Sequence, residues 1–187
     1  MFFTDGLKKY FDINKKLPQR IVVYRDGVSE GDIQYVFEHE LKQIENAISE
    51  IGEAAKNIKL AFIIVTKRIS ARFFARIGER AYENPPPGTI IDNTVTREER
   101  YDFYLISQSV RQGTVAPTMY NIIKDDTNWK PNHHQQLAYK LTHLYFNWQG
   151  TLSVPAPCQY AHKLAYLTGV HLHCEPHPKL TDKLFYL

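Results

Sequence analysis

Two short runs of consecutive apolar residues interrupt a chain that is otherwise mixed in polarity. Residues 21–24 and residues 60–65 are rich in β-branched side chains, which predicts two buried strands. Between them, Ser29 and Asp32 form an S-x-x-D helix-start signature. An amphipathic helix is predicted over residues 30–51, where apolar residues recur at helical spacing: Ile33, Phe37, Leu41, Ile44, Ile48 and Ile51. A strand, a helix and a second strand predict a parallel βαβ unit.

The remaining pattern predicts shorter elements on both sides of this unit. A helix is predicted over residues 5–16, with Asp5 as its N-cap and Pro18 as its stop. Three consecutive prolines exclude regular structure at residues 85–87. Strands are predicted at residues 89–92, 101–106 and 119–123, and helices at residues 132–148 and 158–172. The apolar stripe of the 132–148 helix is Leu137, Leu141, Leu144 and Trp148. The fold class is therefore α/β, with a mixed sheet whose central parallel strands are flanked by helices.

The first predicted strand ends in Arg25, Asp26 and Gly27, charges that are costly to bury without partners. Asp-Gly is a common turn dipeptide, so this ending is consistent with a simple turn. The alternative is that Asp26 faces a cleft, because open α/β sheets bind ligands and metals beyond the carboxyl ends of their strands. The residue pattern leaves both interpretations open.

Composition narrows the class of protein. A length of 187 residues predicts a single domain, residues 1–187, and a net charge of +3 permits a nucleic-acid partner without requiring one. Two cysteines cannot form a disulfide framework, which favours a reducing compartment. No run approaches the length of a membrane span, and the N-terminus does not resemble a signal peptide. We therefore expect a soluble intracellular protein that has no membrane partner.

Few local motifs indicate a catalytic or ligand-binding function. The sequence contains no G-x-S-x-G, phosphate-loop or Rossmann glycine motif. A cluster within residues 171–177 could in principle bind zinc, but its H-x-H-C-x-x-H spacing matches no zinc-finger pattern, so a surface loop is favoured. His162 lies in a predicted helix, where a lone histidine is more often structural than a ligand.

Four separate segments nevertheless resemble one family. They are YRDGVSEG (residues 24–31), GT-x-x-P-x-x-Y (113–120), HLYFNWQGTLSVPAPCQYAHKLAYL (143–167) and the terminal KLFYL (183–187). Together they resemble the Argonaute superfamily, specifically its Piwi clade, from about Leu17 to Leu187. The resemblance implies that residues 1–187 are the C-terminal portion of a PIWI domain whose N-terminal part is absent here. It also implies a partial ribonuclease H-like fold, in agreement with the predicted βαβ unit.

Active members of this family cut RNA with a D-E-D-H tetrad and Mg²⁺. By resemblance, Asp26 matches the second aspartate and His162 matches the histidine, so both are candidate catalytic and metal-binding residues. The first aspartate and the glutamate of the tetrad have no counterpart in this sequence. Since one aspartate and one histidine are too few to hold two magnesium ions, the chain alone is expected to be inactive.

The resemblance also implies residues that contact RNA. Without it, the basic segment would be interpreted as a solvated charged edge. Family positions that approach the guide strand are matched by Lys67, Arg68, Arg72, Gln112, Thr114, Tyr145, Asn147, Gln149 and Ser153. Such contacts position RNA, while base pairing between guide and target supplies the specificity.

Two departures distinguish this sequence from the Ago clade. Leu167 stands where that clade has an arginine near the 5′ phosphate of the guide, and Ala116 replaces another arginine near the RNA. Piwi proteins instead use a magnesium ion beside the 5′ phosphate, with the terminal carboxylate as a ligand. The resemblance therefore implies that Leu187 is a further metal-binding residue.

The leading hypothesis is the PIWI-domain portion of a small-RNA (piRNA)-guided endonuclease acting in gene and transposon silencing. Its expected partners are a small guide RNA, a complementary target RNA, the remainder of an Argonaute chain and proteins of the silencing pathway. Its expected location is the cytoplasm, with perinuclear granules and the nucleus as alternatives. The competing hypothesis is a module that binds guide RNA or protein and does not cleave.

Overall fold

The computed structural model describes residues 2–96, 101–180 and 183–187. Its backbone contacts divide the chain into two compact units. The first comprises Met1–Thr66, Thr96–Asp102 and Tyr120–Trp129, and the second comprises Lys67–Val95, Phe103–Met119 and Lys130–Leu187. No helix in the described part of the chain is long and apolar enough to cross a membrane.

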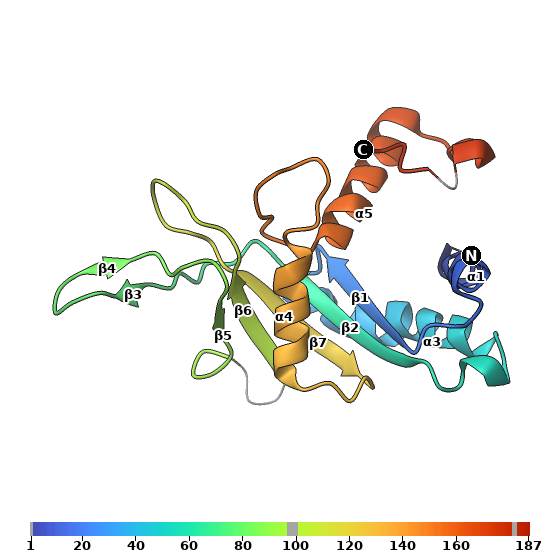
Figure 1. Ribbon diagram of the computed structural model, residues 1–187, viewed down its shortest axis with the longest axis horizontal. Helices are drawn as coiled ribbons and strands as arrows, with labels where there is room; N and C mark the ends of the chain where they lie inside the picture. Colours follow the sequence, from blue (N-terminus) through green and yellow to red (C-terminus); the bar gives the residue numbers. More distant parts are fainter. Residues whose placement is uncertain (1, 97–100, 181–182) are drawn as a thin grey trace. The chain divides into compact units, whose positions relative to one another are not determined.

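Five strands of the described residues form one mixed sheet in the order β1-β2-β7-β6-β5 (Figure 1). β1 (Arg20–Asp26) pairs in parallel with β2 (Lys59–Thr66), and β5 (Thr89–Ile91) pairs antiparallel with β6 (Tyr101–Ile106). β7 (Thr118–Asp125) lies between β2 and β6. The predicted α/β class and its parallel strands are confirmed.

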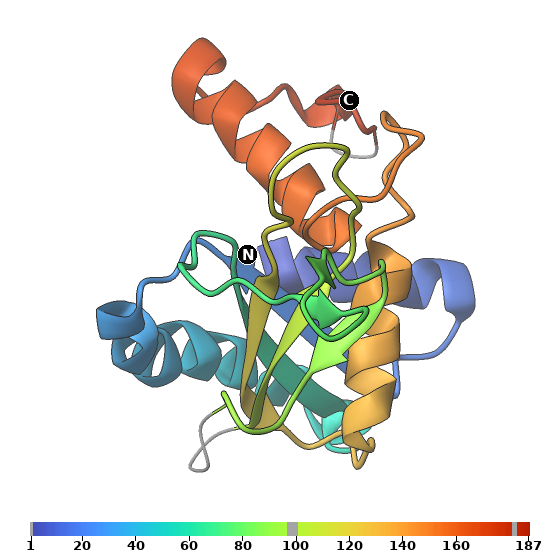
Figure 2. The ribbon, with the colours of Figure 1, turned by 90° about the vertical axis from the view of Figure 1, so that its left-hand side faces the viewer.

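The first unit contains the predicted βαβ arrangement. Helix α1 (Phe2–Asn14) precedes β1, and a helical segment from Glu30 to Ser49 connects β1 to β2. This segment consists of η1 (Glu30–Asp32), α2 (Ile33–Tyr35), the π-helical η2 (Val36–Glu40) and α3 (Leu41–Ser49), and a short turn η3 (Glu53–Ala55) follows. Figures 1 and 2 show the segment lying along one face of the β1–β2 pair.

The core of the first unit forms between this segment and the strands. Its buried members are Val28, Val36, Leu41, Leu60, Phe62 and Ile64. Isoleucines of the helical segment and apolar residues of β1 pack around them: Ile21, Val23, Ile33, Ile44 and Ile48. Burial of these side chains supplies the main driving force for forming the unit.

The prediction that Phe37 lies on the buried face of this helical segment is wrong. Phe37 is exposed, whereas its neighbour Val36 is buried. The cause is the π turn: the buried positions Val36 and Leu41 are five positions apart, whereas same-face positions of an α-helix are three or four apart. The S-x-x-D signature also acts differently from expectation: the Ser29 hydroxyl donates to the Asp32 carboxylate at 2.5 Å and does not cap a backbone N–H.

The second unit contains a short two-stranded sheet, β3 (Ala75–Arg76) with β4 (Tyr82–Glu83), together with β5. Its helices are α4 (Pro131–Leu141) and α5 (Ala156–Tyr166), and α5 continues as the π-helical η4 (Leu167–Leu172). A short turn, η5 (Pro178–Leu180), lies near the C-terminus. Both α-helices begin with proline in the first turn, where its missing N–H is not needed.

Two predicted helix boundaries are wrong. Helix α1 begins at Phe2, so Asp5 lies within its first turn and is not the N-cap. Helix α4 ends at Leu141, seven residues before the predicted end at residue 148. There the buried Thr142 hydroxyl donates to the Tyr139 carbonyl, and the Thr142 carbonyl accepts from the Leu152 N–H at 2.9 Å. The chain therefore turns back, and Leu144 and Trp148 are exposed.

Candidate functional site

Asp26 is the last residue of β1, in register with Val65 of the parallel strand β2. Its side chain is half-buried, and the chain turns at once through Gly27, whose φ of +78° favours glycine. The predicted turn is therefore present directly after the strand. Asp26 stands at the carboxyl end of a parallel pair, where α/β sheets commonly bind ligands.

Arg25 connects this strand end to the helical segment. Its Nε and Nη2 donate to the two carboxylate oxygens of Glu40 at 2.7 and 2.9 Å, and its Nη1 donates to the Asp26 carbonyl at 2.5 Å. Hydrogen bonding to Glu40 raises the pKa of Arg25 above its ordinary value, and the negative charges of Glu40 and Asp26 act in the same direction against partial burial. Sequence reasoning missed this pair, because the π turn that places Glu40 has no simple signature.

His162 lies in the middle of α5 and is exposed. It lines a hollow of about 550 Å³ in the second unit together with Lys163, Leu167, His171 and Leu187. The candidate ligands His162 and Leu187 therefore line the same hollow. The side chains that line it combine cationic or titratable groups with apolar ones.

The candidate metal ligands meet only part of what a hard cation such as Mg²⁺ requires. The Asp26 carboxylate is the type of oxygen ligand that Mg²⁺ prefers. Asp26 belongs to the first unit, and His162 and Leu187 belong to the second. In the described ranges, no group of three or more His, Cys, Asp or Glu side chains is arranged to hold a metal ion, and this includes the histidines and Cys174 of residues 171–177.

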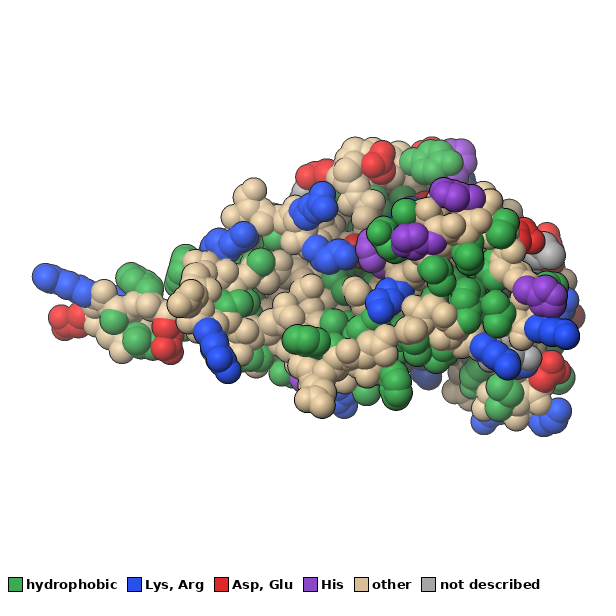
Figure 3. All heavy atoms as spheres, turned by 90° about the horizontal axis from the view of Figure 1, so that it is seen from above, with side chains coloured by type: hydrophobic (Ala, Val, Ile, Leu, Met, Phe, Trp, Pro, Cys, Tyr) green, Lys and Arg blue, Asp and Glu red, His purple; other side chains and the backbone are tan. Residues whose placement is uncertain are grey.

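The basic segment candidates lie between β2 and β3. Arg68 and Arg72 are exposed, and Lys67 is half-buried. Arg72 donates from Nη1 to the carbonyls of Ile69 and Ala71, so it shapes its own loop. The β3–β4 hairpin that follows carries charges of both signs (Figure 3): Arg76, Glu79, Arg80 and Glu83. These four charges cancel, so the excess of positive charge lies in the stretch before the hairpin.

The other RNA candidates occupy two loops of the second unit. Gln112 and Thr114 are exposed between β6 and β7, and Asn147 and Gln149 are exposed between α4 and α5. Tyr145 is buried instead, with its ring 5.1 Å from that of Tyr160. Tyr160 Oη accepts a hydrogen bond from the Phe146 N–H at 3.0 Å. Tyr145 and Tyr160 thus support the α4–α5 loop from beneath.

Three side chains hold the end of this loop through hydrogen bonds to three consecutive backbone carbonyls. Gln108 Nε2 donates to the Thr151 carbonyl, Ser107 Oγ to the Leu152 carbonyl and Thr118 Oγ1 to the Ser153 carbonyl, each at 2.6 Å. Ser107 and Thr118 are buried, so water competes little for these bonds. The three bonds fix the backbone on which Gln149 and Ser153 are presented, and no sequence motif indicated them.

Comparison with known proteins identifies the family. The sequence matches the Piwi domain over residues 2–173. It is 54% identical over 182 residues to Piwi-like protein 1 of Danio rerio, covering 97% of this chain and 21% of that protein. The chain thus spans about a fifth of the length of the curated relatives it matches.

Solved structures agree with the sequence match. The crystal structure of Drosophila Piwi superimposes with a TM-score of 0.89 at 46% identity, covering 100% of this chain and 25% of that one. Kluyveromyces polysporus Argonaute with a guide RNA gives a TM-score of 0.75 at 26% identity, covering 86% of this chain and 20% of that one. The chain therefore belongs to the Piwi domain family, in the Piwi clade of the Argonaute superfamily.

Proposed function

We propose that this chain is the C-terminal portion of the PIWI domain of a Piwi-type, piRNA-guided RNA endonuclease that acts in gene and transposon silencing. The observation that carries the proposal is Asp26, which ends β1 beside the parallel strand β2 in a chain of the Piwi domain family. A carboxylate at this edge of the sheet suits cleavage of a phosphodiester with the help of a divalent cation.

The proposed catalytic residues are Asp26 and His162, with Mg²⁺ as the cofactor. When bound, Mg²⁺ would supply charge stabilisation for phosphodiester cleavage. Asp26 would contribute a carboxylate oxygen and His162 an imidazole nitrogen. The other two acids of the tetrad would come from the remainder of the Argonaute chain.

Guide RNA is the proposed ligand of the polar loops and the basic segment. Lys67, Arg68 and Arg72 would contact phosphates, as would the amide and hydroxyl groups of the 107–117 and 142–155 loops. Leu187 would supply its terminal carboxylate to a cation beside the 5′ phosphate of the guide. His162 and Leu187 border the same hollow, which supports a shared environment for these groups.

The test is an Asp26→Ala substitution in the full-length protein that contains this chain. Guide-loaded protein should lose Mg²⁺-dependent cleavage of a complementary target by at least about a hundredfold, because a metal ligand is removed. Its affinity for guide RNA should remain within about twofold, because Asp26 is acidic and contributes no phosphate contact. Asp12→Ala is the matched control, since Asp12 is an exposed aspartate of α1.

Undiminished cleavage by the Asp26→Ala protein would refute the catalytic role. If the unsubstituted protein binds guide and target but never cleaves, the competing function, a non-cleaving binding module, is correct instead. The same proposal includes a location in the cytoplasm, in perinuclear granules or in the nucleus. It also includes association with proteins of the silencing pathway.

A further inference from the structure

The side chain of Asn84 connects the end of the β3–β4 hairpin to the loop between β6 and β7. Asn84 directly follows β4 and belongs to the same compact unit as this loop, residues 107–117. Its Nδ2 donates to the Gly113 carbonyl at 2.9 Å, and its Oδ1 accepts from the Val115 N–H at 3.0 Å. One amide side chain thus binds both of the peptide groups that flank Thr114.

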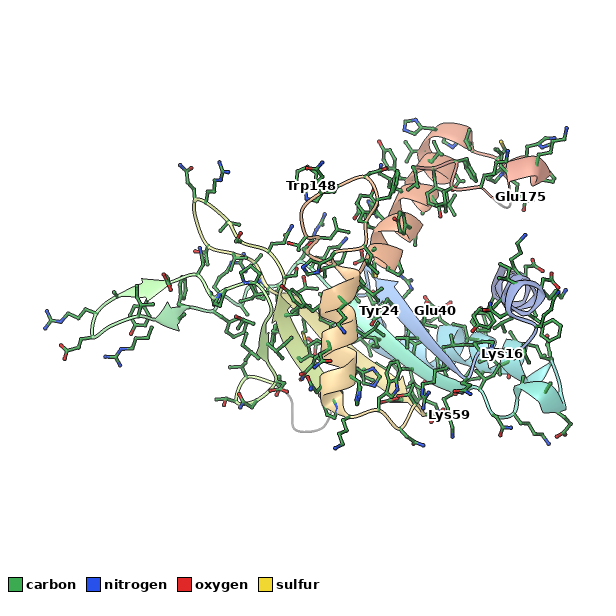
Figure 4. All side chains as sticks on the ribbon, viewed as in Figure 1. Lys16, Tyr24, Glu40, Lys59, Trp148 and Glu175 are labelled. Carbon is green, nitrogen blue, oxygen red and sulfur yellow. The ribbon has the colours of Figure 1, made fainter. Side chains whose placement is uncertain are left out.

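These two bonds meet the loop where its chain turns from a buried position to an exposed tip, residues 111–114. Val115 is 2% exposed, whereas all residues of the tip are exposed. Gly113 has a φ of +77°, a conformation that residues other than glycine rarely adopt. Nitrogen-bearing side chains project from the end of this loop (Figure 4), and Arg111 gives the tip a positive charge that suits a phosphate ligand.

The proline segment that follows Asn84 holds this residue in place. Residues 85–87 are prolines, which fix φ, and the residue before a proline is largely confined to extended conformations. Pro85 is buried, and the Gly88 N–H donates to the carbonyl of Ile106, the last residue of β6, at 2.7 Å. The segment is therefore attached to the base of the same loop, and the Asn84 amide is placed with little further loss of conformational entropy.

The backbone on both sides of Thr114 decides whether its hydroxyl can bind a phosphate. Such a hydrogen bond requires a short distance and a suitable angle, so a loop that samples several conformations forms it in only some of them. The affinity for RNA falls in proportion to the fraction of molecules in the productive conformation. A side chain that fixes this loop therefore strengthens RNA binding without contacting RNA itself.

We propose that Asn84 is a positioning residue of the guide-RNA site, which fixes the backbone on both sides of Thr114 so that Thr114 can bind a phosphate of the guide. The inference rests on the proposed function, in which hydroxyl groups of this loop contact guide phosphates. Both ends of the Asn84 amide are engaged by the loop, through Gly113 and Val115. The contribution of Asn84 to RNA binding is therefore indirect.

The first measurement tests whether Asn84 holds the loop. Hydrogen–deuterium exchange follows the Val115 amide in the full-length protein that contains this chain, without RNA. Asn84→Ala removes the acceptor of this amide, so its exchange should become about tenfold faster, as expected for the loss of a single hydrogen bond. Asn132→Ala is the matched control and should leave this exchange unchanged, because Asn132 is an exposed asparagine of α4 in the same unit.

The second measurement tests the effect on RNA. Equilibrium binding of a 5′-phosphorylated guide RNA to the full-length protein is measured at several salt concentrations. Thr114→Val should weaken binding about tenfold, because it removes a hydrogen bond to a charged group, and Asn84→Ala should weaken it about fivefold. The double variant should bind about as weakly as Thr114→Val alone, and not about fiftyfold more weakly than the unsubstituted protein, because Asn84 acts through Thr114.

The salt dependence separates positioning from general damage to the fold. The slope of log affinity against log salt concentration should be the same in Asn84→Ala as in the unsubstituted protein, because the lysine and arginine contacts to phosphates remain. A general loss of structure would remove those contacts as well and make the slope shallower. A shallower slope in Asn84→Ala would therefore overturn the inference.

The other results also decide the matter. Unchanged Val115 exchange in Asn84→Ala would show that Asn84 does not hold the loop. If Asn84→Ala binds guide normally while Thr114→Val does not, Asn84 has no such role and the proposed Thr114 contact stands. If the two effects multiply in the double variant, Asn84 acts elsewhere and the inference is wrong. If Thr114→Val binds guide normally, the proposed Thr114 contact fails together with this inference, whereas the proposed role of Asp26 is unaffected.

Discussion

Replacing Thr118 by valine should loosen the end of the α4–α5 loop without creating a cavity. Threonine and valine have nearly the same shape, and Thr118 is 2% exposed, so the change removes one hydroxyl from a dry site. The lost contact is the 2.6 Å hydrogen bond to the Ser153 carbonyl. The neighbouring bonds from Ser107 and Gln108 remain.

The expected cost follows from this environment. Leaving a fully buried carbonyl without its partner costs about 1–3 kcal/mol, and the Ser153 carbonyl is only partly buried. Because two adjacent anchors remain, we expect about 1–2 kcal/mol for local opening of the loop, which corresponds to about 5- to 30-fold in the equilibrium constant.

Hydrogen–deuterium exchange of the full-length protein measures this opening. The Leu152 amide, which donates to the Thr142 carbonyl at 2.9 Å, should exchange about 5- to 30-fold faster in the Thr118→Val protein. Thr151→Val is the matched control, because it makes the same substitution in the loop itself at a half-buried position. Unchanged protection in Thr118→Val, or an equal loss in the control, would refute the reasoning that these carbonyl anchors hold the loop.

Three other outcomes are expected. Gly27→Ala should destabilise the β1 end by about 1 kcal/mol in denaturant unfolding, since φ is +78° there, and wild-type stability would show that the turn relaxes without cost. The isolated 187-residue chain should bind RNA weakly, with affinity that falls steeply with salt, and should show no Mg²⁺-dependent cleavage; robust cleavage by the pure chain would contradict the incomplete site. Adding a few residues after Leu187 in the full-length protein should weaken binding of 5′-phosphorylated guide by about tenfold and leave 5′-hydroxyl guide unaffected, because the terminal carboxylate is displaced. Equal affinities with and without the extension would exclude Leu187 from the site.

The sequence predicted the βαβ unit because its signals are local. The apolar runs at residues 21–24 and 60–65 predict buried strands from their own composition. Asp26 is the last residue of the first strand. Family resemblance was needed to choose Asp26 and His162 among many polar residues, since neither carries a specific motif by itself.

The errors and omissions arise where distant residues decide the local structure. Phe37 satisfies helical spacing as well as Val36 does, and only packing around the π turn selects Val36 for the core. The early end of α4 depends on the Leu152 N–H, ten residues beyond Thr142. The Arg25–Glu40 pair and the carbonyl anchors join residues far apart in the chain, which a local pattern cannot reveal.

β1 stands at one end of the five-stranded order in the part of the chain that the structure describes. Its side chains are only partly buried, whereas those of β2 are almost all buried. A strand at the end of a sheet offers main-chain donors and acceptors to a further strand. The free side of β1 is therefore suited to strand addition: a separately produced polypeptide that adds a strand along β1 would dock through its backbone, and protection of the β1 amides from hydrogen exchange would report the docking.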